Sequence, residues 1–273
     1  MNTWNQIYDT FDPIAFSIFS LPVHWYGIMY VLALMSALYV GKYFMKKDKL
    51  DFSSSQIDIY FIYVEIGVIL GARLGYILFY DPNTIYYLTA PWQIFNPFHN
   101  GEFVGIRGMS YHGAVIGFVV GTYLYTKRHK VSMGMIMDLV ALAIPLGFVF
   151  GRIGNFLNQE LIGRETDVPW GILVDGVLRH PSQLYEALLE GFGVFFVVYA
   201  YRKYKKFSGE LILIYAISYG LFRTIAEIYR APDVQIGYVC CDVITQGQVM
   251  SLGMSLLGVM LWVYFYYKNK KLV

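Results

Sequence analysis

The chain has 273 residues, of which 57% are hydrophobic and only 15% are charged, and its formal net charge is +2. A soluble domain carries about 45–50% apolar and about 25% charged residues, so this composition excludes a soluble globule and a disordered chain. The near-neutral charge also excludes the basic footprint of a nucleic-acid-binding protein, and we expect no nucleic-acid partner. The mean hydropathy of +0.47 predicts an integral membrane protein, whose partner is the lipid bilayer.

Seven segments meet or approach the length of a membrane-spanning helix, which is about 20 mostly apolar residues. They lie at residues 19–40, 57–79, 110–126, 133–151, 183–200, 210–229 and 246–267. The first segment follows Asp9 and Asp12 rather than a basic stretch, so we expect a retained helix and not a signal peptide. No soluble insertion separates the segments. We therefore predict an all-α polytopic membrane protein with a single domain over residues 1–273.

The lysines set the expected orientation of these helices. Stretches rich in lysine follow the first, third, fifth and seventh segments, and they hold 14 of the 21 basic residues, including every lysine. The stretches are residues 42–49, 127–130, 202–206 and 268–271. Because positive residues favour the cytoplasmic side of a membrane, we expect the N-terminus outside and the C-terminus in the cytoplasm.

The remaining basic residues are all arginines, and each is expected in an outer loop or in the outer half of a helix. They are Arg73, Arg107, Arg152, Arg164, Arg179, Arg223 and Arg230. Positive charge on that side opposes the expected orientation, so topology does not explain it. Arginine without lysine is typical of bidentate anion recognition. Contact between interfacial arginines and lipid headgroups is the alternative explanation for any one of them.

The sixth segment carries four polar residues on one helical face, at spacings of 4, 4 and 3: Tyr219, Arg223, Glu227 and Arg230. Arg223 is expected about 9 Å inside the outer end of its helix. A charge at that depth normally faces a bundle interior or an aqueous cavity. An isolated Arg223–Glu227 ion pair is one explanation. Because Arg152, Asn155 and Glu160 are expected near the same membrane level, a shared polar cavity is the favoured one.

The sequence lacks the motifs of metal sites, nucleotide-binding sites and serine hydrolase sites. His112 and His180 stand alone without zinc-ligand spacing, and phosphate-loop, nucleophile-elbow and dinucleotide motifs are absent, so we expect no metal and no cofactor. Only two cysteines occur, the adjacent Cys240 and Cys241, which excludes a disulfide framework. Composition alone thus supports an anionic-lipid site on the outer side. An arginine-lined transporter of anionic lipids or solutes is the alternative, although we find no internal repeat.

Several motifs resemble those of one enzyme family. Residues 151–163 match, at every fixed position, the signature Gly-Arg-x-Gly-Asn-Phe-x-Asn-x-Glu-x-x-Gly of the bacterial phosphatidylglycerol–prolipoprotein diacylglyceryl transferases. Segments 25–27, 71–76, 110–117, 179–186 and 219–227 are also similar to family segments, so the resemblance covers nearly the whole chain in order. Two departures stand out: Ala114 replaces the second glycine of a His-Gly-Gly segment, and Glu65 replaces an apolar residue.

The resemblance implies a function and a place in the cell. Such enzymes transfer the diacylglyceryl group of phosphatidylglycerol to the lipobox cysteine in the signal peptide of a prolipoprotein, which is the first step of lipoprotein maturation. The product is a thioether, and glycerol 1-phosphate is released. The family has seven helices with the N-terminus outside, in agreement with the orientation expected from the lysines. It resides in the bacterial inner membrane, with the active site toward the outer side.

The resemblance also implies roles for individual residues. Arg152 and Arg223 would bind phosphate and stabilise the leaving group, and His112 would be the general base. Among the catalytic residues we also count Tyr219, which with Tyr26 would orient the substrate through its hydroxyl. The remaining substrate-binding residues would be Asn155, Glu160, Gly163 and Glu227. Asn155 and Glu160 would position the glycerol headgroup or the arginines, and Gly163 would allow close backbone approach. We expect His180 to be structural, capping the fifth helix, and Cys240 and Cys241 to lie outside the machinery.

Overall fold

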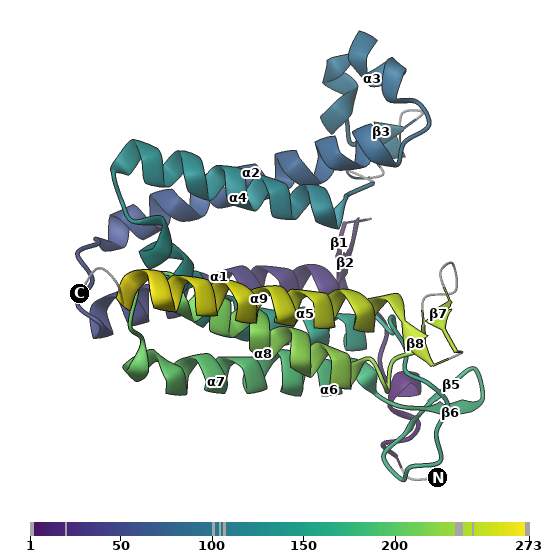
Figure 1. Ribbon diagram of the computed structural model, residues 1–273. Helices are drawn as coiled ribbons and strands as arrows, with labels where there is room; N and C mark the ends of the chain where they lie inside the picture. Colours follow the sequence, from purple (N-terminus) through teal and green to yellow (C-terminus); the bar gives the residue numbers. More distant parts are fainter. Residues whose placement is uncertain are drawn as a thin grey trace. The chain divides into compact units, whose positions relative to one another are not determined.

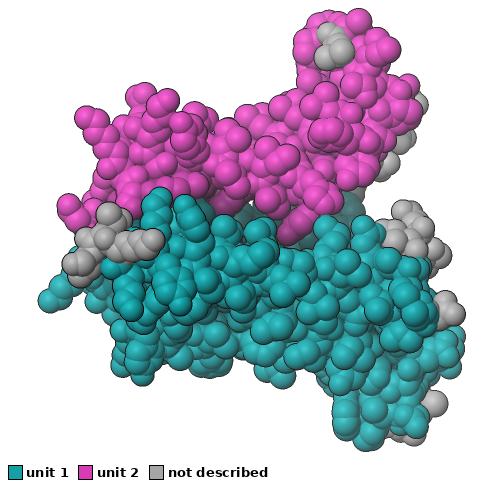
Figure 2. All heavy atoms as spheres, in the orientation of Figure 1, with its two compact units in different colours: residues 1–50, 134–273 teal, residues 51–133 magenta. Residues whose placement is uncertain are grey.

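The described residues fall into two compact units. The computed structural model describes residues 3–19, 21–99, 102–103, 105, 108–232, 237–241 and 243–270. Unit 1 comprises Met1–Leu50 and Gly134–Val273, and unit 2 comprises Asp51–Met133 (Figure 2). Each unit is described by itself below, and the single domain stays a prediction.

Each of the seven apolar segments coincides with a helical stretch. Unit 1 holds α1 (Trp25–Lys47), α5 (Met133–Leu157), α8 (Glu210–Ala226) and α9 (Gln246–Lys270), besides a stretch that runs from α6 (Ser182–Glu186) through a π-helix (Ala187–Gly193) into α7 (Val194–Tyr201). Unit 2 holds α2 (Ser54–Phe79), α4 (Tyr111–His129) and the short α3 (Thr84–Thr89) (Figure 1). Within the described ranges, five stretches are long and apolar enough to cross a membrane: α1, α2, α5, Ser182–Tyr204 and α9.

Short hairpins and 3₁₀ turns occupy the connections. The paired strands are β1 (Ile14–Ile18) with β2 (Leu21–His24), β3 (Phe98–His99) with β4 (Glu102–Phe103), β5 (Ile172–Val174) with β6 (Val177–Arg179), and β7 (Tyr238–Cys240) with β8 (Ile244–Thr245). The 3₁₀ turns are η1 (Ile7–Thr10), η2 (Pro91–Phe95) and η4 (Arg202–Tyr204). The first hairpin corrects the predicted start of the first helix at residue 19. Because Pro22 favours extended backbone at the preceding residue, a strand forms there and α1 begins only at Trp25.

The lysine-carrying stretches of unit 1 meet at one end of its helices. Arg202, after α7, pairs with Asp48, after α1, at 2.6 Å. Lys205 pairs with Asp138 near the start of α5 at 3.0 Å. Asp138 also accepts hydrogen bonds from the backbone N–H groups of Gly209 and Leu211, at the start of α8. These charged loops are therefore held together at what we call the lysine end of unit 1.

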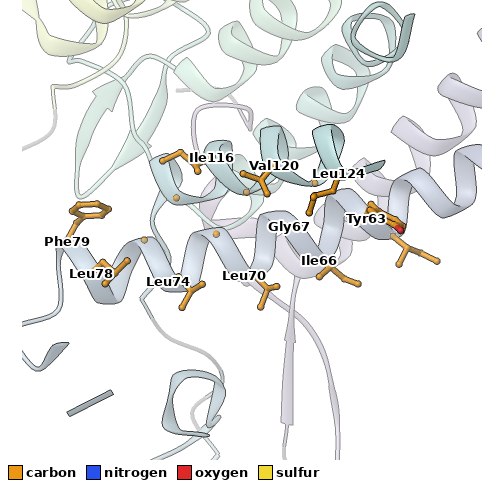
Figure 3. A pocket seen from close by; sticks show the side chains of 16 residues that line it. Tyr63, Ile66, Gly67, Leu70, Leu74, Leu78, Phe79, Ile116, Val120 and Leu124 are labelled. Atoms are coloured by element: carbon orange, nitrogen blue, oxygen red, sulfur yellow. The ribbon is translucent and has the colours of Figure 1, made fainter. Parts of the chain in front are cut away.

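In unit 2, α2 and α4 pack through glycines (Figure 1). Both helices repeat glycine every four residues, at 67, 71 and 75 in α2 and at 113, 117 and 121 in α4. A Cβ on Gly71 would overlap the carbonyl oxygen of Gly113, and one on Gly117 would overlap that of Gly67. Small residues at this spacing let membrane helices approach closely. Beside the contact, apolar side chains of both helices border a groove of about 550 Å³ (Figure 3).

Candidate active site

Arginine and glutamate side chains from three helical stretches form one buried network in unit 1. Arg152 lies on α5, fourteen residues and about 21 Å along the helix from Asp138 at the lysine end. Glu186 ends α6, and Glu190 lies in the π-helix that follows. Arg223 lies on α8, with Glu227 just beyond its end. The network therefore occupies the end of unit 1 that faces away from the lysines.

Arg223 is the most connected residue of this arginine–glutamate network. Its Nη1 lies 3.1 Å from Oε1 of Glu186 and 3.2 Å from Oε1 of Glu190. Its Nη2 lies 2.6 Å from Oε2 of Glu227. The Arg223–Glu227 ion pair considered from the sequence is thus present, but it belongs to a shared network rather than standing alone.

Glu186 contacts all three arginines of the network. Its Oε2 lies 2.8 Å from Nη1 of Arg152, and its Oε1 lies 3.7 Å from Nη1 of Arg230. Arg152 also lies 3.9 Å from Oε2 of Glu190, and its guanidinium stacks 4.5 Å above the ring of Phe148. Two carboxylates therefore hold the guanidinium group of Arg152, and three hold that of Arg223.

Burial makes these ion pairs mutually dependent. The side chains of Glu186 and Glu190 are 0% exposed, while those of the three arginines are 11–13% exposed. Removing one partner of a buried pair costs about 3–5 kcal/mol, because the other charge is left uncompensated. With three guanidinium groups and three carboxylates the network is formally neutral. It still offers a donor, since Arg152 Nε is buried and has no hydrogen-bond acceptor in the described part of the chain.

The π-helix brings Glu190 against α5. A Cβ on Gly191 would overlap the Val149 side chain of α5 and lie 3.3 Å from the carbonyl oxygen of Pro145, so glycine permits this close packing. Pro145 lies inside α5, where it cannot donate a backbone hydrogen bond. π-Helical turns frequently mark functional sites. Glu186 and Glu190 were assigned no role from the sequence, although two glutamates four residues apart in an apolar segment were a visible signal.

Asn155 and Glu160 extend the network toward the loop that follows α5. Asn155 accepts a hydrogen bond from Nη1 of Arg152 at 3.4 Å and donates from Nδ2 to Oε1 of Glu160 at 2.7 Å. Gln183 donates to the backbone carbonyl of Glu160 at 2.5 Å and to the hydroxyl of Tyr8 at 3.3 Å. Burial raises the pKa of Tyr8 to about 12, so this phenol stays neutral. Asn155 and Glu160 are thereby held by Arg152 on one side and by Gln183 on the other.

The N-terminal residues cover this loop. Tyr8, Phe156 and Ile172 form a buried apolar cluster. Gln159 donates from Nε2 to the backbone carbonyls of Tyr8 and Phe11, at 3.0 and 3.3 Å. The stretch before the first predicted helix, to which the sequence analysis assigned no structure, therefore helps to hold the signature loop in place.

Gly163 lies where two other backbone segments approach it. It forms a β-bridge with Arg230, and a Cβ at this position would overlap the carbonyl oxygen of His180. Any side chain here would displace the loop that carries Arg230. The close backbone approach at Gly163 is therefore made by the segments around His180 and Arg230.

His180 does not cap a helix, which corrects the sequence-based expectation. Pro181 is the N-cap residue of α6, and no side chain caps that end. The His180 ring instead lies 3.2 Å from the Tyr185 hydroxyl through Nδ1 and packs edge-on against Tyr229 at 5.2 Å. Burial lowers the pKa of His180, which favours a neutral imidazole. Its contacts are therefore those of a packed aromatic residue.

The two tyrosines expected to orient substrate lie near the network. The Tyr219 ring packs edge-on against Phe148, the ring on which Arg152 stacks, at 5.8 Å. Tyr26, at the start of α1, is 44% exposed, and a Cβ built on Gly154 would lie 3.4 Å from its ring. Both rings therefore lie beside α5, the helix on which the signature begins.

His112 belongs to unit 2 and is described there. It is the second residue of α4 and is exposed, and its Nδ1 lies 3.5 Å from the hydroxyl of Tyr80. Ser110 caps the same helix by accepting from the backbone N–H of Gly113 at 3.2 Å. The structure therefore gathers Arg152, Arg223, Glu227 and the signature residues in one unit and His112 in the other.

The other arginines that were expected on the outer side hold loops instead of joining the network. Arg164 donates to the backbone carbonyls of Arg230 and Glu227 at 2.9 and 3.5 Å. Arg73, buried in unit 2, donates to those of Ile94 and Gly108 at 2.5 and 3.1 Å. Arg179 pairs with Glu165 at 3.3 Å, and Arg107 lies outside the described residues. Cys240 and Cys241 are free and exposed, and Glu65 is partly buried.

Comparison with known proteins relates the chain to one family. The family model for prolipoprotein diacylglyceryl transferases matches residues 13–264. A phosphatidylglycerol–prolipoprotein diacylglyceryl transferase of Campylobacter lari is 60% identical over 271 residues, which cover 99% of each chain. The enzymes of that name in Campylobacter hominis and Wolinella succinogenes are 62% and 61% identical, over 94% and 98% of this chain and 92% and 98% of their own.

Proposed function

The chain belongs to the prolipoprotein diacylglyceryl transferase family, and on that premise we propose that it transfers the diacylglyceryl group of phosphatidylglycerol to the lipobox cysteine of prolipoproteins. The names of its relatives and their near-complete coverage support this function over transport of an anionic solute. The observation that carries the proposal is the buried arginine–glutamate network beside the family signature.

The proposed topology has seven membrane spans, with the N-terminus outside and the C-terminus in the cytoplasm. Besides the five long apolar stretches, it includes α4 with 19 residues and α8 with 17 residues. The gathering of lysine-carrying loops at one end of unit 1 supports a cytoplasmic location for that end. The arginine–glutamate network then lies toward the outer face of the bacterial inner membrane.

The proposed reaction is displacement at the lipid glycerol carbon that bears the phosphate. The cysteine sulfur forms the new S–C bond, while the C–O bond to phosphate breaks and its electron pair leaves with glycerol 1-phosphate. Negative charge therefore develops on the departing phosphate, where preorganised donors stabilise the transition state most. The guanidinium groups of Arg152 and Arg223 would supply those donors, because the glutamates already hold them in place.

The carboxylates matter for this role because arginine side chains are flexible. A free side chain of this type carries about 2 kcal/mol of rotamer entropy. In the network that freedom is removed before substrate binds. Asn155, which bonds to both Arg152 and Glu160, would together with Glu160 position the glycerol headgroup or Arg152 itself. Tyr26 and Tyr219 would orient the lipid through their hydroxyls, and Glu227 would hold Arg223.

The thiol proton needs an acceptor, because a free cysteine has a pKa near 8.5 and reacts as the thiolate. His112 is the proposed base, since histidine is the side chain that most often takes a proton in general-base catalysis. Its exposed ring at the start of α4 is open to a substrate.

Mass spectrometry of a lipobox peptide tests the function directly. Purified protein, phosphatidylglycerol and the peptide should yield a peptide heavier by one diacylglyceryl group, with one glycerol 1-phosphate released per peptide modified. A peptide with alanine in place of the cysteine should gain no mass. Absence of the adduct, together with movement of phosphatidylglycerol or anionic solute across vesicles, would favour the transporter alternative.

A further inference from the structure

An aromatic groove lies between α1 and α7 near the lysine end of unit 1, away from the arginine–glutamate network. It holds about 340 Å³ and is lined chiefly by Val40, Tyr43, Phe44, Phe195, Phe196 and Tyr199. Phe196 is 63% exposed and Tyr43 is 47% exposed, so the groove opens on the surface of the helix pair. Both helices belong to stretches long and apolar enough to cross a membrane, and the opening would therefore face lipid.

At the lysine end of this groove, the ammonium group of Lys47 is held by tyrosine hydroxyls and aromatic rings. Its ammonium group lies 3.1 Å from the Tyr43 hydroxyl and 3.3 Å from the Tyr199 hydroxyl. It also lies 5.1, 5.7 and 5.2 Å from the ring centroids of Tyr43, Phe44 and Tyr199. Cation–π contacts and phenol oxygens thus hold the ammonium group from two helices.

The charge of Lys47 is not balanced by a carboxylate among the described residues. Its neighbour Asp48 is engaged by Arg202 at 2.6 Å. Phenol oxygens and ring faces orient an ammonium group but carry no formal negative charge. Lys46, one residue earlier, is exposed and makes none of these contacts, although it contributes the same charge to the topology signal. The groove therefore combines an apolar wall with the Lys47 ammonium at its end. Arg202 also lies over the Phe44 and Tyr199 rings, at 4.9 and 5.3 Å, but its charge is balanced by Asp48.

We propose that the groove binds an anionic phospholipid, with an acyl chain along the aromatic wall and the phosphate on Lys47 and its two phenol hydroxyls. Basic pockets between membrane helices on the cytoplasmic side bind anionic headgroups in this way. The apolar wall selects a lipid over a free phosphate ion. This site is distinct from the proposed transferase site, since Tyr199 lies nine residues, about 14 Å along the helix, from Glu190. The lipid site itself does not depend on the proposed topology. The topology decides only the leaflet: if the lysine end is cytoplasmic, the bound lipid belongs to the inner leaflet.

Native mass spectrometry of the full-length protein in detergent tests the site. The probe is dioleoyl phosphatidylserine, which is anionic but lacks the glycerol headgroup that the transfer reaction consumes. One lysine near a headgroup contributes about 1 kcal/mol, and 1.4 kcal/mol corresponds to tenfold in affinity, so Lys47→Gln should weaken the first binding event about fivefold. Lys46→Gln, which removes the same charge one residue away, should leave it unchanged.

Two further measurements keep the result unambiguous. Tyr199→Phe removes one phenol but keeps the lysine, and it should weaken phosphatidylserine binding by about half the free energy lost in Lys47→Gln. Dioleoyl phosphatidylcholine should bind the wild-type protein and all three variants equally. Equal losses in Lys46→Gln and Lys47→Gln, or full displacement of the lipid by inorganic phosphate, would overturn the proposal. Each variant should also transfer diacylglyceryl at the wild-type rate, so a failure of the lipid site and a failure of the transferase function are read separately.

Discussion

Replacing Arg152 with lysine tests whether the arginine–glutamate network works through geometry or only through charge. Arg152 reaches Glu186 at 2.8 Å and Asn155 at 3.4 Å, and its planar group stacks on Phe148 at 4.5 Å. A lysine ammonium keeps one charge for Glu186 but loses the fork, the Nε donor and the planar stacking. Removing one preorganised donor to a developing oxyanion costs about 10²–10³ in kcat, or about 2.7–4 kcal/mol, and we expect that loss for Arg152→Lys.

The measurement is the rate of lipobox-peptide modification at saturating phosphatidylglycerol, with thermal unfolding of the same samples. Because the variant keeps the buried charge paired, it should unfold near the wild-type temperature while its kcat falls. Arg179→Lys is the matched control, since Arg179 pairs with Glu165, whose side chain is 71% exposed, and it should lose less than about twofold. Arg107→Lys should also be tolerated. A fully active Arg152→Lys enzyme would show that a point charge suffices, and the geometric argument would fail.

Three further predictions address the base, the buried carboxylate and the topology. His112→Gln should slow transfer about 10²–10⁴-fold, with partial recovery as the pH rises toward 8.5 and the substrate thiol ionises by itself; a defect that does not change with pH would mean that His112 holds lipid or structure. Glu186→Ala should lower the free energy of unfolding by about 3–5 kcal/mol, because it removes one of three buried carboxylates and leaves one positive charge of the network uncompensated. Glu165→Ala, at an exposed pair, should cost less than about 1 kcal/mol in chemical denaturation. In intact cells an impermeant thiol reagent should label the exposed Cys240 and Cys241, which are expected outside. In a Cys240→Ser, Cys241→Ser background, the reagent should not label a cysteine placed at Lys47. Labelling at that position would reverse the orientation.

Helical segments were readable from the sequence because hydropathy is a local property. All seven predicted stretches coincide with helices, although α1 and α5 continue to residues 47 and 157, past the predicted ends at 40 and 151, because polar residues lower the hydropathy of their last turns. At the first helix, the β1–β2 hairpin occupies residues that hydropathy alone assigned to the membrane. The short hairpins in the connections between helices were likewise not predicted, since strands of two to five residues carry little pattern of their own.

The residues of the arginine–glutamate network were partly predictable. Arg223 and Glu227 were identified because charges are costly inside a membrane helix, and Arg152, Asn155 and Glu160 because they belong to the signature. The spacing of Arg230 placed it with Arg223 and Glu227, but nothing in the sequence showed that Arg73 and Arg164 hold backbone carbonyls instead. That division depends on which loop each guanidinium meets.

Composition and lysine placement thus determined the class of protein and its expected orientation, and the signature determined its family. Only the tertiary structure decided that Glu186 and Glu190 hold the arginines. Those pairs join residues more than thirty positions apart, on helices whose relative rotation is set by packing at Gly191 and the π-helix. A helical repeat shows which face of each segment is polar. It does not show which face of another helix will meet it, because that is decided by the close packing of all the helices together.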